Sequence, residues 1–364
     1  MIPVTKSYLP PIEEYQAYLE RIWATNQLTN HGPLVQELEI KLKDYLGVKH
    51  LFLVSNGTIA LQIAIKTLGE PGEIITTPFS YVATTSSIVW EGFTPVFVDI
   101  DPETLCIDPD LVETAITPQT RAILPTHVYG IPCAVEKIEQ IARKHGLKVI
   151  YDAAHTFGVS YNGKSLASYG DISTLSFHAT KLFHTVEGGA IITNDDELAH
   201  KVSYMRNFGH KGQEDFWGLG INGKNSEFHA AMGLCNLPHL PEIIAARKQV
   251  SIWYDELLIG SGLVRPSLPE FTKYNFAYYP VVFPTETSLI KSRDHLSELG
   301  IFPRRYFYPS LSNLMYLEKK KIEIADRISS QVLCLPIYCD LTRNDVDKIV
   351  SIILSRYRFD LQKA

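Results

Sequence analysis

A lysine between two apolar runs is the residue with the clearest chemical potential. The run Ile172–Phe177 is typical of a β-strand, Lys181 follows it by four residues, and a second apolar run, Ala190–Thr193, begins after two glycines. Burial disfavours the charged form of a lysine, and a neutral lysine amine is a nucleophile suited to forming a Schiff base. Taken alone, however, the segment fits an exposed lysine at a strand end better, because lysines are mostly exposed.

Two further groups stand at expected strand ends. Ser55-Asn56-Gly57-Thr58 opens a helix, whose free N–H groups and dipole favour an anion such as phosphate, although a plain N-cap explains the same residues. Asp152 ends the expected strand 147–151, where a buried carboxylate needs a cationic partner. A protonated pyridine nitrogen is one such partner, and a helix cap or a buried salt bridge are the alternatives.

Three more side chains could surround a planar ring that Lys181 binds. Tyr81 follows the expected strand 74–77 and could stack on the ring, His155 could pack against its other face, and Ser176 could donate a hydrogen bond to a phosphate. Each also has a structural explanation, as a core aromatic or a hydrogen-bonded polar residue. Together with Lys181 and Asp152, however, they converge on pyridoxal 5'-phosphate.

The pattern around these residues predicts an α/β protein. From residue 51 to 152, short apolar runs alternate with helical segments, which indicates a buried parallel sheet with ligands outside the carboxyl ends of its strands. After Leu234 the alternation weakens into a helix over 241–258, a strand-like run over 274–283, and helices over 288–299 and 344–358. We expect an N-terminal arm (1–34), a large α/β domain (35–235) and a small α+β domain (236–364).

Composition excludes several classes of function. With 364 residues, 45% hydrophobic and 20% charged, the chain is typical of a globular protein with two domains. A net charge of −6 without a basic face argues against nucleic acid and a membrane surface as partners. The five scattered cysteines lack a CxxC pair, and the N-terminus lacks an apolar signal core, so we expect a cytoplasmic location and no metal site.

An ordered series of motifs over nearly the whole chain resembles the DegT/DnrJ/EryC1/StrS sugar aminotransferases, within the fold-type I pyridoxal phosphate enzymes. The landmarks are Leu28-Thr29-Asn30-His31-Gly32-Pro33, Ser55 to Leu61, Pro95-Val96-Phe97-Val98-Asp99, His127-Val128-Tyr129-Gly130, Asp152-Ala153-Ala154-His155, Ser176 to Lys181, Glu187-Gly188-Gly189, and Asn222 through Gly233. The resemblance implies a large domain with a mostly parallel seven-stranded sheet flanked by helices, and a smaller α+β C-terminal domain.

The resemblance also implies a role for each candidate residue. Lys181 matches the catalytic Schiff-base lysine and Asp152 the partner of the pyridine nitrogen. The cofactor phosphate would be bound by Gly57, Thr58 and Ser176. Tyr81 matches the stacking aromatic, His155 a position facing the phenolic side of the cofactor, and Asn222 an asparagine that reaches the phosphate across a dimer interface. A homodimer is therefore expected.

Two positions separate this chain from branches of the family. The run Asn222-Gly223-Lys224 replaces a common Asn-Tyr-Arg, and lysine is not equivalent to arginine at a bidentate site. Lys181 itself stands where a dehydratase branch of the family has histidine, which argues against dehydration as the activity of this chain.

The resemblance predicts transamination of a nucleotide-linked 4-keto-6-deoxy sugar, with L-glutamate as amino donor. The best match is dTDP-4-keto-6-deoxy-D-glucose giving dTDP-4-amino-4,6-dideoxy-D-glucose, for O-antigen sugar biosynthesis. Candidate contacts to the sugar nucleotide are His178, Lys211, Lys224 and Tyr308, each of which could also be structural. The alternatives are amination at C3, a GDP- or UDP-sugar, a non-catalytic regulator that binds the cofactor, and a nucleotide-binding module. The last of these lacks both phosphate-loop signatures.

Overall fold

A seven-stranded sheet forms the centre of the computed structural model, which describes residues 1–361. The strand order is β2-β10-β9-β6-β5-β3-β4, and only β10 runs antiparallel to its neighbours. The strands are β2 (His50–Val54), β3 (Glu73–Thr76), β4 (Thr94–Phe97), β5 (Thr120–Leu124), β6 (Lys148–Asp152), β9 (Ile172–Ser176) and β10 (Gly189–Thr193). The predicted α/β fold with a mostly parallel sheet is confirmed.

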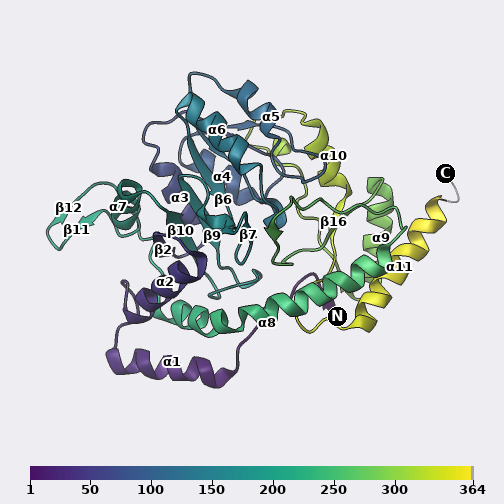
Figure 1. Cartoon of the computed structure of the whole chain (residues 1–364), viewed down its shortest axis with the longest axis horizontal. Coiled ribbons are helices and arrows are strands. Elements are labelled where there is room, and N and C mark those ends of the chain that lie inside the picture. Colours follow the sequence, from purple (N-terminus) through teal and green to yellow (C-terminus); the bar gives the residue numbers. More distant parts are fainter. Residues whose placement is uncertain (362–364) are drawn as a thin grey trace.

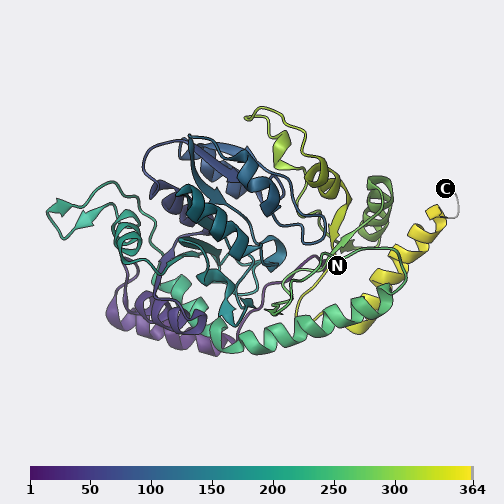
Figure 2. The same cartoon turned by 45° about the horizontal axis from the view of Figure 1, so that its top comes forward.

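Both faces of the sheet are buried, which is why its strands read as continuous apolar runs. Ile74 packs on one face and Ile75 on the other, and the same alternation separates Ile191 from Ile192. The flanking helices are α2 (Pro33–Leu46), α3 (Gly57–Lys66), α4 (Val82–Trp90), α5 (Pro109–Val112), α6 (Val135–His145) and α7 (Asp196–Met205). One face packs on α3, α4 and α7, and the other on α2, α5 and α6 (Figures 1 and 2).

The register of the strands brings the candidate residues to one edge of the sheet. Asp152 pairs with Thr174 between β6 and β9, and Ser176 pairs with Gly189 between β9 and β10. The glycines before β10 therefore lie next to the strand that leads to Lys181.

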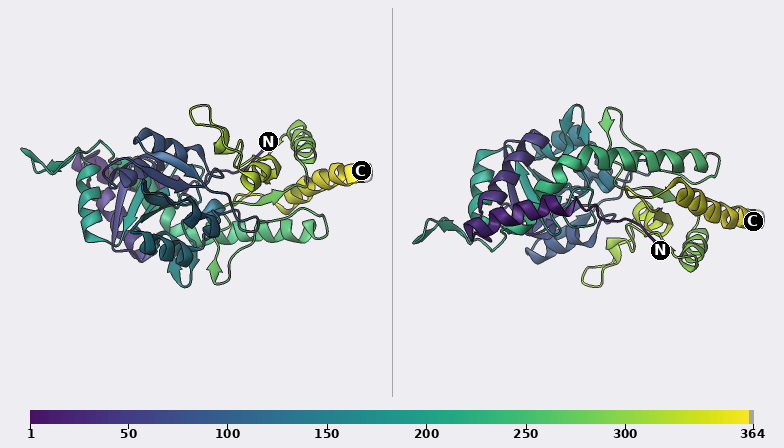
Figure 3. Two further views of the ribbon diagram at one scale, coloured as in Figure 1. Left: turned by 90° about the horizontal axis from the view of Figure 1, so that it is seen from above. Right: turned by 90° about the horizontal axis from the view of Figure 1, so that it is seen from below.

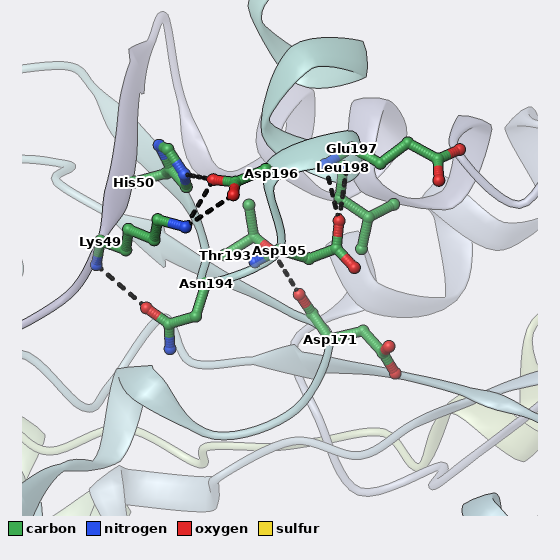
Figure 4. Close-up of polar contacts among 9 residues, drawn as sticks. All are labelled: Lys49, His50, Asp171, Thr193, Asn194, Asp195, Asp196, Glu197 and Leu198. Carbon is green, nitrogen blue, oxygen red and sulfur yellow. Dashed lines mark hydrogen bonds and ion pairs between the residues drawn. The ribbon is translucent and has the colours of Figure 1, made fainter.

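The other end of β10 lies at the opposite edge of the sheet, where polar contacts fix the turn into α7. Asp195 Oδ1 accepts hydrogen bonds from the N–H groups of Glu197 and Leu198, and Asp196 contacts both Lys49 and His50 (Figure 4). The side chain of Asp195 is thus the N-cap that starts α7.

The long helix α8 (Glu227–Leu258) connects the sheet to the C-terminal part of the chain (Figure 1). Sequence reasoning placed its start at Pro241, and this was wrong: the helix begins after Ser226, whose hydroxyl accepts a hydrogen bond from the His229 N–H, and it continues through two prolines. The expected domain boundary at 235/236 falls inside α8. The helix contributes Leu234 to the core beneath the sheet and Val250 to a separate C-terminal core.

The C-terminal core lies between helices and a two-stranded sheet. The elements of the C-terminal part are β14 (Pro280–Val282), α9 (Glu286–Glu298), β15 (Ile301–Phe302), α10 (Glu323–Gln331), β16 (Val332–Cys334) and α11 (Arg343–Leu361). Of these, α10 packs its buried Ala325 and Ile328 on the core of the central sheet. The strand expected over 274–283 is shorter than predicted, because the Asn275 amide donates to the carbonyls of His155 and Phe157 and its oxygen accepts from the Ala277 N–H. These side-chain bonds replace the backbone ladder there.

The N-terminal segment ties the two parts together. The strand β1 (Ile2–Pro3) pairs with β15, Ser7 Oγ donates to the Ala179 carbonyl at 2.6 Å, and α1 (Ile12–Thr25) then packs against α8. The segment therefore joins the C-terminal core to the loop that carries Lys181. The division into an arm and two domains stays a prediction.

Two small hairpins complete the described chain. One joins β7 (Ser160–Tyr161) and β8 (Lys164–Ser165), and β13 (Thr272–Lys273) adds a third strand beside β7. The other joins β11 (His210–Lys211) and β12 (Asp215–Phe216) and projects from the body in every view (Figures 1 and 3). Within residues 1–361, no helix is both long and apolar enough to cross a membrane.

Candidate active site

A cavity of about 450 Å³ opens at the carboxyl ends of β6 and β9, where parallel sheets place their ligand sites. Its lining includes seven of the eight residues expected to bind the cofactor: Gly57, Thr58, Tyr81, Asp152, His155, Ser176 and Lys181. A larger groove of about 1190 Å³, lined by Lys148 and Asp171 among others, lies at the opposite edge of the sheet. Because the candidate catalytic groups gather in the smaller cavity, we take that cavity as the site.

Lys181 points into this cavity as a partly buried amine. Burial lowers its pKa below the usual lysine value, while the nearby Asp152 carboxylate opposes the shift. Its Nζ donates a hydrogen bond to Tyr278 Oη at 3.3 Å, and its backbone N–H donates to the His178 carbonyl at 2.8 Å. The loop is thus held in a turn, and a lowered pKa favours the neutral, nucleophilic amine.

Asp152 is a buried carboxylate without a cationic partner. Its side chain accepts hydrogen bonds from Thr84 Oγ1 at 2.6 Å and from the Ala154 N–H at 3.1 Å, and burial raises its pKa. Among the described residues, no basic side chain lies within ion-pair distance of it, so the alternative of a buried salt bridge fails in the part of the chain described. A protonated ring nitrogen in the cavity would supply the missing positive charge, so this carboxylate fits the pyridine ring of pyridoxal phosphate.

The N-terminus of α3 offers an anion site beside Ser176. Asn56 Oδ1 accepts from the Ile59 N–H at 2.9 Å, so the residue is an N-cap as well. The N–H groups of Gly57 and Thr58 have no acceptor within residues 1–361. A Cβ atom at Gly57 would lie 2.9 Å from Ser176 Cβ, so only glycine permits this approach. The residues present therefore fit a phosphate.

His155 and Tyr81 lie on the walls of the cavity. His155 is buried, its Nδ1 accepts from the Tyr129 N–H at 3.1 Å, and burial holds its pKa well below the usual histidine value. The neutral imidazole lies parallel to the ring of Phe307 with centroids 5.7 Å apart. Tyr81 precedes α4 and is 55% exposed at the mouth. Both are placed to contact a planar ring, and their roles remain predictions.

Of the four expected substrate contacts, only His178 lines the cavity in one chain. Its Nδ1 lies 2.8 Å from Thr180 Oγ1, and its Nε2 lies 3.6 Å from Glu187 Oε1. Tyr308 lies outside the lining, with the guanidinium of Arg305 over its ring at 3.5 Å. Lys211 is on the projecting hairpin, where it pairs with Asp215.

Asn222 and Lys224 also lie away from Lys181. Lys224 Nζ donates to Asn222 Oδ1 at 2.9 Å and lies over the ring of Phe208. Lys224 lines a separate hollow of about 510 Å³ together with His31 and Arg206. A single chain therefore does not bring either residue to the Lys181 cavity.

Sequence reasoning missed four residues of the site. Thr84 donates to Asp152, Tyr278 accepts from Lys181, and Arg304 and Tyr306 line the cavity. The two tyrosines and the arginine come from the C-terminal part, where no strand–helix pattern marks which residues face the sheet. The paired arginines at 304 and 305 were the one available signal.

We predict that Tyr278→Phe shifts the pH dependence of Lys181 reactivity toward lower pH. Tyr278 stays protonated because burial raises its pKa, and its oxygen favours the charged lysine more than the neutral one. Losing that acceptor lowers the pKa of Lys181 further, so the amine becomes reactive at lower pH. The rate at which pyridoxal phosphate binds, measured by absorbance across pH, checks this. At high pH, where the amine is neutral in both proteins, the rate of the variant should be about tenfold below wild type, because Tyr278 no longer orients the amine.

Tyr274→Phe is the matched control. Tyr274 is also buried, but its hydroxyl donates to the Tyr129 carbonyl at 2.8 Å and does not touch Lys181. Its variant should keep the wild-type pH profile. Equal profiles for both variants would contradict a positioning role for Tyr278.

Comparison with known proteins places the chain among sugar aminotransferases. A model of the DegT/DnrJ/EryC1/StrS aminotransferase family matches residues 11–354. A dTDP-4-amino-4,6-dideoxy-D-glucose transaminase of Shigella dysenteriae is 46% identical over 96% of this chain and 97% of its own length, and one of Escherichia coli is 43% identical over 98% of each.

A solved structure agrees with these sequence matches. The structure of DesI in the presence of its TDP-sugar product superposes with a TM-score of 0.93 at 31% identity, covering 100% of this chain and 96% of DesI. The expected family, fold and cofactor are confirmed. The chain belongs to the DegT/DnrJ/EryC1/StrS aminotransferase family and is a pyridoxal phosphate-dependent aminotransferase.

Proposed function

We propose that this aminotransferase converts dTDP-4-keto-6-deoxy-D-glucose into dTDP-4-amino-4,6-dideoxy-D-glucose, with L-glutamate as amino donor. The observation that carries the chemistry is the juxtaposition of the Lys181 amine and the unpaired, buried Asp152 carboxylate in one cavity. The two relatives that share 46% and 43% of their residues with this chain support the choice of sugar, since both are named for that product.

Pyridoxal phosphate, when bound, supplies a conjugated ring that withdraws electrons from the carbon bearing the exchanged amine. In our proposal, Asp152 holds a proton on the ring nitrogen, and Thr84 orients the carboxylate by donating to Oδ2. Gly57, Thr58 and Ser176 bind the phosphate. The Nζ atom of Lys181 would hold the cofactor, and the same amine is placed to take up and return the proton of the reacting carbon.

Three alternatives remain distinct from this proposal. The chain could aminate C3, or act on a GDP- or UDP-linked sugar, and nothing in the cavity lining separates these substrates. A regulator that binds the cofactor without turnover is less well supported, because the lysine and the carboxylate that the reaction needs lie together.

A role in O-antigen synthesis in the cytoplasm is part of the proposal, inferred from the sugar.

We further propose that the active unit is a homodimer whose sites are completed by the partner subunit. Asn222 and Lys224 lie outside the Lys181 cavity of their own chain and follow the hairpin β11–β12, which projects from the body (Figure 3). Phe216, Trp217 and Leu219, in and directly after this hairpin, are exposed. Apolar side chains on a projection favour a covering partner. Sedimentation of the purified chain should show a dimer, and a monomer at micromolar concentration would contradict this.

The visible spectrum of the holoenzyme tests the reaction. L-Glutamate should remove the absorbance of the lysine-bound cofactor, and dTDP-4-keto-6-deoxy-D-glucose should then restore it with formation of the amino sugar. The corresponding GDP- and UDP-linked keto sugars, and a dTDP-3-keto sugar, are the competing substrates. Restoration by one of them instead would reassign the sugar and keep the transamination.

Lys181→Ala is the control variant. It should fold, since the side chain makes one long hydrogen bond, and it should never show the absorbance of lysine-bound cofactor. If wild-type protein with excess cofactor behaves like Lys181→Ala, the assignment of the lysine is wrong and the regulator alternative gains support.

A further inference from the structure

An arginine that forms no ion pair with any described side chain lines the Lys181 cavity. Arg304 is exposed beside Tyr306, and among the side chains that the structure describes, those of residues 1–355, no carboxylate lies within ion-pair distance of its guanidinium. The guanidinium instead lies over the ring of Tyr306, 5.0 Å from the centroid. The ring limits where the side chain can go and leaves its N–H donors available to a ligand.

The backbone of Arg304 is fixed by hydrogen bonds to the strand β16. Its N–H donates to the Cys334 carbonyl at 3.1 Å, and the Cys334 N–H donates back to the Arg304 carbonyl at 2.8 Å. Cys334 is buried in β16. The side chain therefore starts from a rigid position, which lowers the entropy lost when it binds a ligand.

The neighbouring Arg305 has a structural role and serves as a comparison for Arg304. It donates to Glu286 Oε1 at 2.6 Å and to the Ser330 carbonyl at 2.9 Å, and its side chain is 9% exposed. The two adjacent arginines thus differ: the guanidinium of Arg305 is bound within the fold, whereas Arg304 lines the cavity and is exposed.

The charges of the cavity and of its proposed substrates favour a cationic side chain such as that of Arg304. The lining carries two acidic side chains, Asp152 within it and Glu187 beside His178. Both substrates of the proposed reaction are anionic, because L-glutamate carries carboxylates and the nucleotide sugar a diphosphate. The planar guanidinium fork matches either group through paired N–H···O bonds.

We propose that Arg304 is an anion-binding residue of this cavity, which binds the carboxylate or the diphosphate oxygens of the substrate in front of Lys181. The position of Arg304 does not depend on the proposed function. The identity of the two ligands does, because they are the substrates of the proposed reaction. The two anions share one chemistry, so separate probes are needed to tell which of them uses the site.

Binding of unreactive anions to the holoenzyme tests the proposal. Succinate represents the dicarboxylate and dTDP the diphosphate, and calorimetry gives both dissociation constants. Arg304→Gln should raise one or both dissociation constants by about tenfold or more, because the variant loses a charge-assisted bidentate pair of hydrogen bonds. Arg343→Gln is the charge-matched control. Arg343 begins the distant α11 and pairs with Asp347 of the same helix and with Glu256 of α8, so the constants of this variant should stay wild type.

Each pattern of results assigns the site or removes it. If only the dissociation constant of succinate rises, Arg304 binds the amino donor. If only that of dTDP rises, Arg304 binds the nucleotide sugar. If both rise, Arg304 binds each substrate in its own half of the reaction. Constants within about twofold of wild type for both probes overturn the proposal. If no keto sugar is turned over but Arg304→Gln still weakens succinate, the anion site stands and the proposed function fails.

Arg304→Lys keeps the test decisive if Arg304→Gln does not fold. Lysine retains the charge and removes the planar pair of donors, so the constant of the assigned anion should lie between wild type and the glutamine variant. Lysine constants equal to wild type for both probes, in a protein with native circular dichroism, would also overturn the proposal.

Discussion

The buried carboxylate of Asp152 is the constraint around which the cavity is arranged. A carboxylate removed from water is costly unless it is hydrogen-bonded and faces a positive charge. Thr84 and the Ala154 N–H provide the hydrogen bonds, and the described residues provide no cation within ion-pair distance. The missing charge is the feature that makes this cavity fit a protonated pyridine ring rather than an apolar ligand.

The sheet determines where the remaining groups lie relative to that carboxylate. Asp152 ends β6, Ser176 ends β9, and their pairing within one sheet brings the Lys181 loop to the same edge. The C-terminal part then closes the cavity with Tyr278, Arg304 and Tyr306. A lysine between these two halves loses hydration from both sides, which lowers its pKa and favours its reactive form.

The order of strands and helices could be predicted from the sequence because the central sheet is buried on both faces. Local patterns fixed Asp152, Ser176 and Lys181 at strand ends, and the sheet brought them together. The start of α8 was misjudged because Pro241 resembles a helix N-terminus, whereas the hydroxyl of Ser226 caps the helix far earlier. Tyr278 and Arg304 escaped prediction because their position depends on packing between distant segments, for which local periodicity carries no signal.

The protonation of the cofactor ring tests the central claim most directly. Nitrogen NMR of the holoenzyme, loaded with pyridoxal phosphate labelled at the ring nitrogen, distinguishes a protonated from a neutral pyridine. The account predicts a protonated nitrogen in the wild type at neutral pH and a neutral one in Asp152→Asn, which keeps the shape and loses the charge. A neutral nitrogen in the wild type, or no difference between the two proteins, would contradict it.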